Sequence, residues 1–267
     1  MNRKLIFFDI DGTLIGGGSQ KMSDSTIRAI KRARQNGHVC VINTGRTQPI
    51  VGEEITGQVE FDGILMGCGT QIYYHGEELL HHTFSVEMAK RIIEGLKRHR
   101  IDALLEGADD IFCQAEEDLY TNGFRKYMKF LRTIYQFGTQ AEAPGNFDKF
   151  YAYVDKRETM EAFAEEFQEE LTFIDREKGF YEIVPKECSK ASAMRFLSDR
   201  LQIPMEDTVA IGDSNNDIPM LDCAGVGIAM GNSSGELIAM ADYVTTDVGQ
   251  DGIWNALKWL GVLDTHA

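Results

Sequence analysis

Short, continuous apolar runs recur in the N-terminal part of the chain, and helix-like segments separate them. The first run is Leu5–Phe8 and the second is Val39–Ile42. Continuous apolar runs are typical of strands that are buried on both faces of a sheet, whereas a strand with one exposed face alternates apolar and polar residues. The pattern therefore predicts strands that alternate with helices. We expect strands at 4–10, 39–42 and 63–66, helices at 24–36 and 47–56, and a hairpin of 71–74 with 78–81.

The C-terminal part of the chain repeats this pattern. Ser189 is a suitable N-cap for a helix over 190–202, which has apolar residues on one face. The run Thr208–Ile211 predicts a strand that ends at Gly212-Asp213. Both ends of the chain therefore predict an α/β fold with a doubly wound, Rossmann-like parallel sheet. We also expect helices at 216–222, 234–241 and 251–260 and a strand at 225–229.

The middle of the chain, residues 85–185, has a different pattern. Charged amphipathic helices, such as 157–170 with Leu171 continuing its helical spacing, are interleaved with alternating strands such as 149–154. This combination predicts an open α+β sheet with one face covered by helices. A segment of about 100 residues can fold as a unit, so we expect an inserted domain. We assign 1–82 and 186–267 to the α/β core and 83–185 to the inserted α+β domain.

The composition predicts a folded protein of the cytoplasm. Hydrophobic residues make up 43% of the 267 residues, which is enough for a substantial core. No apolar run reaches the roughly 18 residues of a membrane helix, and the run before Asp9 is too short for a secretory signal. The five cysteines are scattered and odd in number, which is typical of reduced thiols.

The formal net charge of −15 argues against nucleic acid as a partner. It also constrains any anionic substrate. A phosphate site in such a protein must reverse the electrostatic field locally, by means of a metal ion, a lysine or backbone N–H groups.

Two carboxylates follow the first predicted strand directly, because Asp9 and Asp11 flank Ile10. Gly12 and Thr13 then turn the chain away. Two neighbouring carboxylates at the end of a buried strand repel each other unless a cation or a proton resolves the repulsion. A hard divalent cation with oxygen ligands is the economical solution, and it makes the pair a candidate site for phosphate chemistry.

Three further polar motifs accompany this pair. Asn43-Thr44-Gly45-Arg46 follows the second predicted strand, Lys190 begins the helix capped by Ser189, and Gly212–Asp217 follows the strand at 208–211. Open parallel sheets bind ligands at the carboxyl edge of their strands, where three of these four motifs are expected. Each motif alone is weak evidence, since a lysine at a helix start is commonly solvated. One site that needs all four chemistries explains all four positions.

In order and spacing, these motifs resemble those of the haloacid dehalogenase (HAD) superfamily, specifically its Cof-type phosphatases with a large inserted cap. The resemblance covers residues 3–82 and 186–260. The matching motifs are Asp9-Ile10-Asp11-Gly12-Thr13, Thr44-Gly45-Arg46, Ser189-Lys190 and Gly212-Asp213-Ser214-Asn215-Asn216-Asp217.

The resemblance implies roles for these residues. Asp9 would attack phosphorus and carry an aspartyl-phosphate, and Asp11 would act as general acid and then as general base. Thr44 and Lys190 would complete the catalytic set by contacting phosphoryl oxygens. A Mg²⁺ cofactor would be held by Asp9, Asp11 through its backbone carbonyl, Asp213 and, less directly, Asp217. The expected phosphate-binding residues are Gly12, Thr44, Gly45, Arg46, Lys190 and Asn216.

Four departures from the family pattern stand out, and two of them, Gly67–Thr70 and Glu187-Cys188, lie near the expected boundary between the core and the inserted domain. Gly16–Gly18 stands where relatives carry a less flexible loop, and we expect it to let the loop beside Asp9 open and close. Asn43 stands where a small apolar residue is usual.

The sequence thus predicts a magnesium-dependent phosphatase that acts on a small phosphorylated metabolite, for instance a sugar phosphate. Two alternatives stay open. A phosphomutase or phosphotransferase would use the same aspartyl-phosphate with a sugar acceptor in place of water. A non-catalytic phospho-accepting signalling module would also hold magnesium, but such modules need no cap and no acid at position 11.

Overall fold

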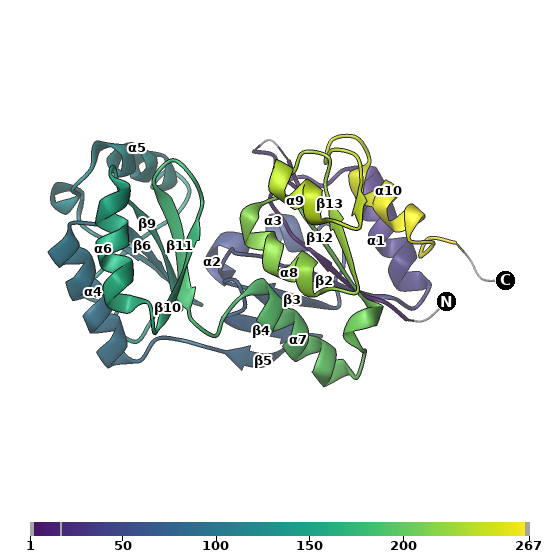
Figure 1. Cartoon of the computed structure of the whole chain (residues 1–267), viewed down its shortest axis with the longest axis horizontal. Helices are drawn as coiled ribbons and strands as arrows, with labels where there is room; N and C mark the ends of the chain where they lie inside the picture. Colours follow the sequence, from purple (N-terminus) through teal and green to yellow (C-terminus); the bar gives the residue numbers. More distant parts are fainter. Residues whose placement is uncertain (1–2, 17, 265–267) are drawn as a thin grey trace. The chain divides into compact units, whose positions relative to one another are not determined.

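The computed structural model of the chain describes residues 3–16 and 18–264 (Figure 1). The described residues form two compact units. The core unit lies within 1–46, 50–80 and 189–267, and the inserted unit comprises 47–49 and 81–188. Of the glycine loop that we expect to be flexible, Gly17 lies outside the described residues. The prediction that the first unit is the catalytic core and the second a cap stays a prediction.

The core unit is built on an eight-stranded sheet with the order β14-β13-β12-β1-β2-β3-β4-β5. The pairs from β14 to β3 are parallel, and β4 pairs with β3 in the antiparallel direction. The strands are β1 (Leu5–Phe8), β2 (Val39–Asn43), β3 (Gly63–Met66), β4 (Gln71–Tyr74), β5 (Glu77–His81), β12 (Thr208–Gly212), β13 (Val226–Ala229) and β14 (Tyr243–Val244). The predicted α/β fold class is confirmed.

Both faces of this sheet are covered by helices, as the continuous apolar runs predict. Alternate residues of β1 point to opposite faces: Ile6 and Phe8 join one hydrophobic cluster, and Leu5 and Phe7 join another. Helices α1 and α10 pack in the first cluster, and α7, α8 and α9 contribute to the second (Figure 1). The helices of the core unit are α1 (Asp24–Gln35), α3 (Glu53–Thr56), α7 (Lys190–Leu201), α8 (Ile218–Cys223), α9 (Gly235–Met240) and α10 (Gly252–Trp259), with 3₁₀ turns η2 (Met205–Asp207) and η3 (Asn215–Asp217).

Two of the predicted helices differ from expectation. The segment 47–56 forms two short helices, α2 (Gln48–Val51) and α3, because Gly52 adopts a φ of +70° between them. The helix expected over 157–170 ends at Phe167. Leu171 continues the helical spacing of apolar residues, but it begins β10 and pairs with Pro185 instead, so strand pairing determines its conformation.

The inserted unit contains a six-stranded sheet with the order β10-β11-β9-β6-β7-β8. Its neighbouring strands pair in the antiparallel direction except for β7 and β8, which are parallel. Its elements are α4 (Val86–His99), β6 (Asp102–Glu106), β7 (Ile111–Cys113), η1 (Glu116–Asp118), α5 (Asn122–Leu131), β8 (Gly138–Thr139), β9 (Lys149–Tyr153), α6 (Arg157–Phe167), β10 (Leu171–Asp175) and β11 (Phe180–Pro185).

Helices α4 and α6 cover one face of this second sheet, and Phe150 of β9 packs in the cluster that they form. The next residue, Tyr151, points to the other face. There the rings of Tyr127 from α5 and Phe180 from β11 lie 5.2 Å apart, centroid to centroid. The open face that we expect from the sequence is therefore partly covered by α5. In the part of the chain that the structure describes, no helix is long and apolar enough to cross a membrane.

The aromatic packing of the inserted unit gives a stability prediction. Phe163 of α6 is fully buried against other aromatic rings. Its replacement in Phe163→Ala leaves a cavity and should lower the free energy of unfolding by about 3–5 kcal/mol. The control Phe130→Ala removes a ring that is 62% exposed and should change it by less than about 0.5 kcal/mol. Urea unfolding measures both, and equal shifts in the midpoint would contradict this packing.

Candidate active site

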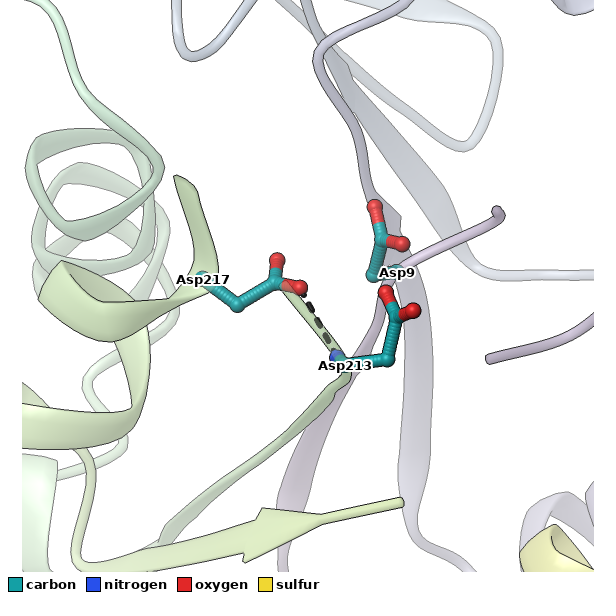
Figure 2. A group of neighbouring side chains, drawn as sticks. All are labelled: Asp9, Asp213 and Asp217. Carbon is teal, nitrogen blue, oxygen red and sulfur yellow. Dashed lines mark hydrogen bonds between the residues drawn. The ribbon is translucent and has the colours of Figure 1, made fainter. Parts of the chain in front are cut away.

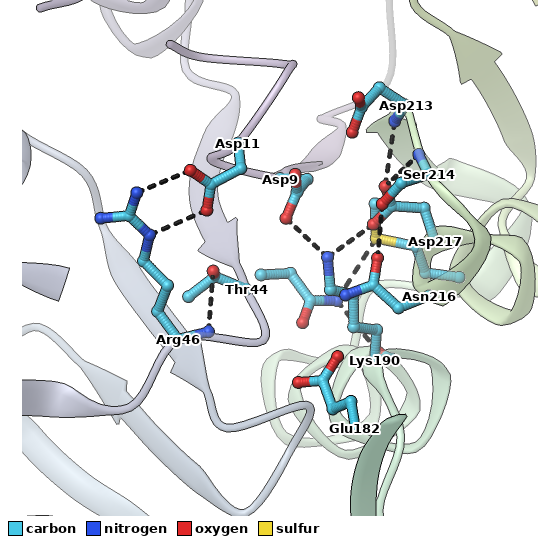
Figure 3. A network of polar contacts seen from close by, with 12 residues as sticks. Asp9, Asp11, Thr44, Arg46, Glu182, Lys190, Asp213, Ser214, Asn216 and Asp217 are labelled. Carbon is cyan, nitrogen blue, oxygen red and sulfur yellow. Dashed lines mark hydrogen bonds and ion pairs between the residues drawn. The ribbon is translucent and has the colours of Figure 1, made fainter. Parts of the chain in front are cut away.

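The four motifs meet at one edge of the core sheet. Strands β12, β1 and β2 are neighbours, and Asp213, Asp9 and Thr44 directly follow them in the chain. Lys190 begins α7, which packs on the same sheet. The arrangement follows from parallel strands, whose carboxyl ends share one edge. All four predicted motifs are therefore brought together (Figure 3).

The centre of the site is the side chain of Lys190. Its Nζ donates to Asp9 Oδ1 at 2.6 Å and to Asp217 Oδ1 at 2.5 Å. The side chain of Lys190 is fully buried, and those of Asp9 and Asp217 are 6% and 0% exposed. A buried ammonium is stable only when charged and hydrogen-bonding partners replace water, and the two carboxylates supply this.

The start of α7 is defined by its own hydrogen bonds. Ser189 is the N-cap, and its side chain accepts from the backbone N–H of Ser192 at 3.0 Å. The Ser192 hydroxyl in turn accepts from the N–H of Ser189 at 2.9 Å. This reciprocal capping box fixes the first helical turn, so the backbone of Lys190 has a defined starting point.

The loop after β12 holds Asp217 from the opposite direction. Its Oδ2 accepts from the backbone N–H of Asp213 at 2.9 Å (Figure 2). The same oxygen accepts from the backbone N–H of Ser214 at 3.0 Å (Figure 3). The Asp217 carboxylate therefore bridges this loop to Lys190. The Asp217 side chain is fully buried, so it organises the site from inside the protein.

Asp9, Asp213 and Asp217 form an acidic group in which one carboxylate oxygen of each lies within 4.8 Å of the others. Gly12 lies against this group with a φ of +82°, and a Cβ placed there would be 2.0 Å from Asp213 Oδ2. Because glycine has no Cβ, Gly12 leaves room where the carboxylates converge. Oxygen donors around a compact space are the ligands that a hard divalent cation prefers, so the residues fit such an ion.

The electrostatics support the same conclusion. Burial and the negative charge of Asp217 raise the pKa of Asp9 to about 8, although Lys190 acts in the opposite direction. Burial alone would lower the pKa of Lys190, but the charges of Asp217 and Asp9 outweigh it and raise that pKa, so the ammonium stays protonated. One ammonium therefore does not balance the three carboxylates, and a divalent cation would supply the missing positive charge.

The side chain of Asp11 lies outside this acidic group and is paired with Arg46. The guanidinium makes a two-pronged contact, with Nε 2.8 Å from Oδ2 and Nη2 2.6 Å from Oδ1 (Figure 3). Arg46 is further held by Nη1, which donates to the carbonyl of Ile50 at 3.2 Å. The structure thus gives the guanidinium a carboxylate partner, and phosphate binding by Arg46 stays a prediction.

Thr44 and Asn216 are buried beside the centre. The hydroxyl of Thr44 accepts from the backbone N–H of Arg46 at 3.1 Å, which leaves its own proton to be donated. Asn216 Oδ1 accepts from the Ser214 hydroxyl at 2.8 Å. Gly45 joins Thr44 to Arg46 in the same loop. The predicted phosphate contacts of these residues and of Gly12 stay predictions.

The roles of Ser214 and Asn43, which lie within the predicted motifs, were not predicted from the sequence. Ser214 supplies a backbone N–H to Asp217, and its side chain takes part in a capping box with Asp217. The Ser-x-x-Asp spacing is a recognised signal for such a box, so it could have been found. Asn43 donates to the carbonyl of Lys190, a contact between residues 147 positions apart that no local pattern reveals.

Comparison with known proteins agrees with this geometry. A family model for haloacid dehalogenase-like hydrolases matches residues 6–257. Phosphatase YwpJ of Bacillus subtilis is 27% identical over 96% of this chain and 99% of its own length. The B. subtilis protein 5-amino-6-(5-phospho-D-ribitylamino)uracil phosphatase YcsE is 26% identical over 96% and 94%. A solved structure of a HAD superfamily phosphatase from Bacteroides thetaiotaomicron has a TM-score of 0.86 at 25% identity, covering 97% and 96%.

The doubly wound core and the acidic site at its carboxyl edge suit a hydrolase. The chain belongs to the haloacid dehalogenase-like hydrolases, and it is a phosphatase. The resemblance indicated by the sequence is confirmed.

The raised pKa of Asp9 predicts how metal removal changes stability with pH. Without metal, the native state holds the Asp9 proton between the ordinary pKa of 3.8 and about 8, whereas the unfolded state releases it. The native state binds more protons in this window, so its free energy of unfolding falls as pH rises through it. A bound divalent cation competes with that proton, so it should stabilise more at pH 8.5 than at pH 5.

Thermal unfolding in a chelator at pH 5, 7 and 8.5 measures this dependence. The matched control is Asp9→Asn, which has nothing to titrate at this position and should show a flatter decline in Tm. The same pH dependence in both proteins would show that Asp9 keeps an ordinary pKa.

Proposed function

We propose that the chain is a magnesium-dependent phosphatase that hydrolyses a small phosphorylated metabolite through an aspartyl-phosphate on Asp9. The observation that carries the proposal is the position of the Lys190 ammonium, 2.6 Å from Asp9 Oδ1, inside an acidic group that suits a divalent cation. Lys190 engages one oxygen of Asp9, Oδ1, so the carboxylate has a second oxygen for attack on phosphorus.

In the first step, a carboxylate oxygen of Asp9 attacks phosphorus and the ester P–O bond breaks. Protonated Asp11 gives its proton to the departing oxygen, so the product alcohol leaves neutral. Both oxygens of the Asp11 carboxylate are held by the Arg46 guanidinium, so this pair must open before Asp11 can reach the departing oxygen.

In the second step, the Asp11 carboxylate takes a proton from water as the water oxygen attacks phosphorus. The bond between Asp9 and phosphorus breaks, which regenerates the Asp9 carboxylate and releases inorganic phosphate. Asp11 ends this step protonated and is ready to act as the acid again. The two steps together consume one water molecule and balance in atoms and charge.

Charge stabilisation is shared among several groups. Lys190 contributes a fixed positive charge and Thr44 a hydroxyl proton toward the equatorial oxygens. Magnesium, held by Asp9, Asp213 and the main chain of Asp11 with Asp217 behind them, would supply further positive charge when bound. Asp217 keeps Lys190 in place through their 2.5 Å contact. Phosphate monoesters need such sharing, because their hydrolysis can require up to ~10²¹-fold acceleration.

For the substrate, we propose a phosphorylated sugar or sugar alcohol. The support is the relative YcsE, whose name gives a phosphoribityl compound as its substrate, and which aligns with nearly the whole of this chain. We further propose that the inserted unit excludes water during phosphorylation of Asp9 and contacts the leaving group.

Phosphate release from a panel of sugar phosphates, sugar-alcohol phosphates, nucleotides and one aryl phosphate tests the reaction. We expect turnover with Mg²⁺, loss of turnover in a chelator, and at least a thousandfold lower kcat in Asp9→Asn. The matched control Asp199→Asn changes an exposed aspartate of α7 and should keep wild-type turnover. Chelator-resistant hydrolysis by Asp9→Asn would refute the mechanism. Transfer to a sugar acceptor without phosphate release would indicate a phosphomutase instead.

The role of Asp11 as acid gives a separate prediction. Alkyl phosphates need a proton on the leaving oxygen, whereas an aryl phosphate with an acidic phenol leaves unaided. Asp11→Asn should therefore lower kcat for a sugar phosphate by about 10²–10⁴-fold. The first-step rate with the aryl phosphate, read as the burst of phenol release, should fall far less. Equal losses in phenol burst and sugar-phosphate turnover would show that Asp11 is not the proton donor.

A further inference from the structure

Asn43 is a polar residue at the end of an otherwise apolar buried strand. It is the last residue of β2, and its exposed fraction is 0%. Its backbone pairs in register with Leu65 of β3, so the strand itself does not need an amide side chain. A polar group in such a place requires partners, because burial removes its contacts with water.

The partners of Asn43 are on α7 and α8. Its Nδ2 donates to the backbone carbonyl of Lys190 at 3.0 Å and contacts Met220 Sδ at 3.6 Å. A carbonyl can only accept, so the nitrogen of the amide must face Lys190 and the oxygen must face away. That oxygen, Oδ1, is buried without a hydrogen-bond partner among the described residues.

This pattern is poorly explained by stability alone. A buried oxygen without a partner costs at least as much free energy as one neutral hydrogen bond returns. An apolar side chain of the same shape would remove that cost and keep the packing. The amide fixes the distance between the end of β2 and the first residue of α7, which a leucine would not do.

That distance matters to the site. The capping box of Ser189 and Ser192 shapes the first turn of α7, but its hydrogen bonds lie within that turn. The Asn43 contact joins this turn to the strand whose next residue is Thr44. We propose that Asn43 is a positioning residue that acts through Lys190: it holds the lysine backbone so that the ammonium lies between Asp9 and Asp217, in register with the Thr44 hydroxyl. This proposal rests on the proposed phosphatase function.

A flexible lysine side chain can still reach its carboxylates when its backbone shifts, so substrate binding survives a small displacement. Stabilisation of transition-state charge is more demanding, because it depends on the position of the ammonium relative to the reacting phosphoryl oxygens. A misplacement of about 1 Å can cost on the order of 10²-fold in rate. Loss of Asn43 should therefore lower kcat more than it raises KM.

The test is Asn43→Leu, assayed with an aryl phosphate and Mg²⁺ and compared with the wild type. We expect kcat to fall at least tenfold, KM to change less than threefold, and the thermal unfolding midpoint to be unchanged or higher. The matched control is Thr70→Val, which removes another fully buried side-chain oxygen that has no hydrogen-bond partner among the described residues. It should leave kcat unchanged. Asn43→Ala removes the same donor without added volume, and it replaces the leucine variant if that one fails to fold.

A double-mutant cycle with Lys190→Met separates positioning from a general structural role. If Asn43 acts through Lys190, then Asn43→Leu weakens binding of orthovanadate, which mimics the five-coordinate transition state, measured by calorimetry with Mg²⁺, only when Lys190 is present. The same factor in both backgrounds would overturn the proposal, as would wild-type kcat in Asn43→Leu. A wild-type protein that releases no phosphate from any ester in the panel would refute the proposed function instead.

Discussion

The site depends on one interaction, the burial of the Lys190 ammonium between the carboxylates of Asp9 and Asp217. Each partner comes from a different part of the chain: the end of β1, the first residue of α7 and the turn after β12. A charge in this position is tolerated only if all three segments are held in place, because loss of any one leaves an unpaired buried charge. The hydrophobic clusters on both faces of the core sheet provide that support. Assembly of the site therefore depends on the packed core.

Much of this arrangement could be predicted from the sequence. Continuous apolar runs are sufficient to indicate strands buried on both faces, and parallel strands place the residues that follow them at one edge. Asp9, Thr44 and Asp213 are found there for that reason. The capped helix start at Ser189 was predicted from residue type and is confirmed by the capping box. These features are local, or they follow from topology, so a single sequence contains the information.

The remaining features depend on side chains that meet across long sequence separations. The pairing of Arg46 with Asp11 joins residues 35 positions apart, and it gives a predicted phosphate ligand a carboxylate partner. Neither residue type nor spacing distinguishes these two roles of an arginine. Leu171 shows the same limit in the fold, because its spacing suits a helix while pairing with Pro185 places it in a strand. In each case a contact that forms only in the folded protein outweighs the local pattern.

Gly12 also bears on the genetics of this protein. The carboxylate of Asp213 occupies the space where any other residue would place its Cβ, and the backbone conformation there is left-handed. Every single-base change in a glycine codon that alters the protein either adds a Cβ or stops translation. At this position no missense allele is conservative, alanine included. A substitution in this one codon therefore displaces the Asp213 carboxylate or strains the backbone, although glycine contributes no functional group of its own.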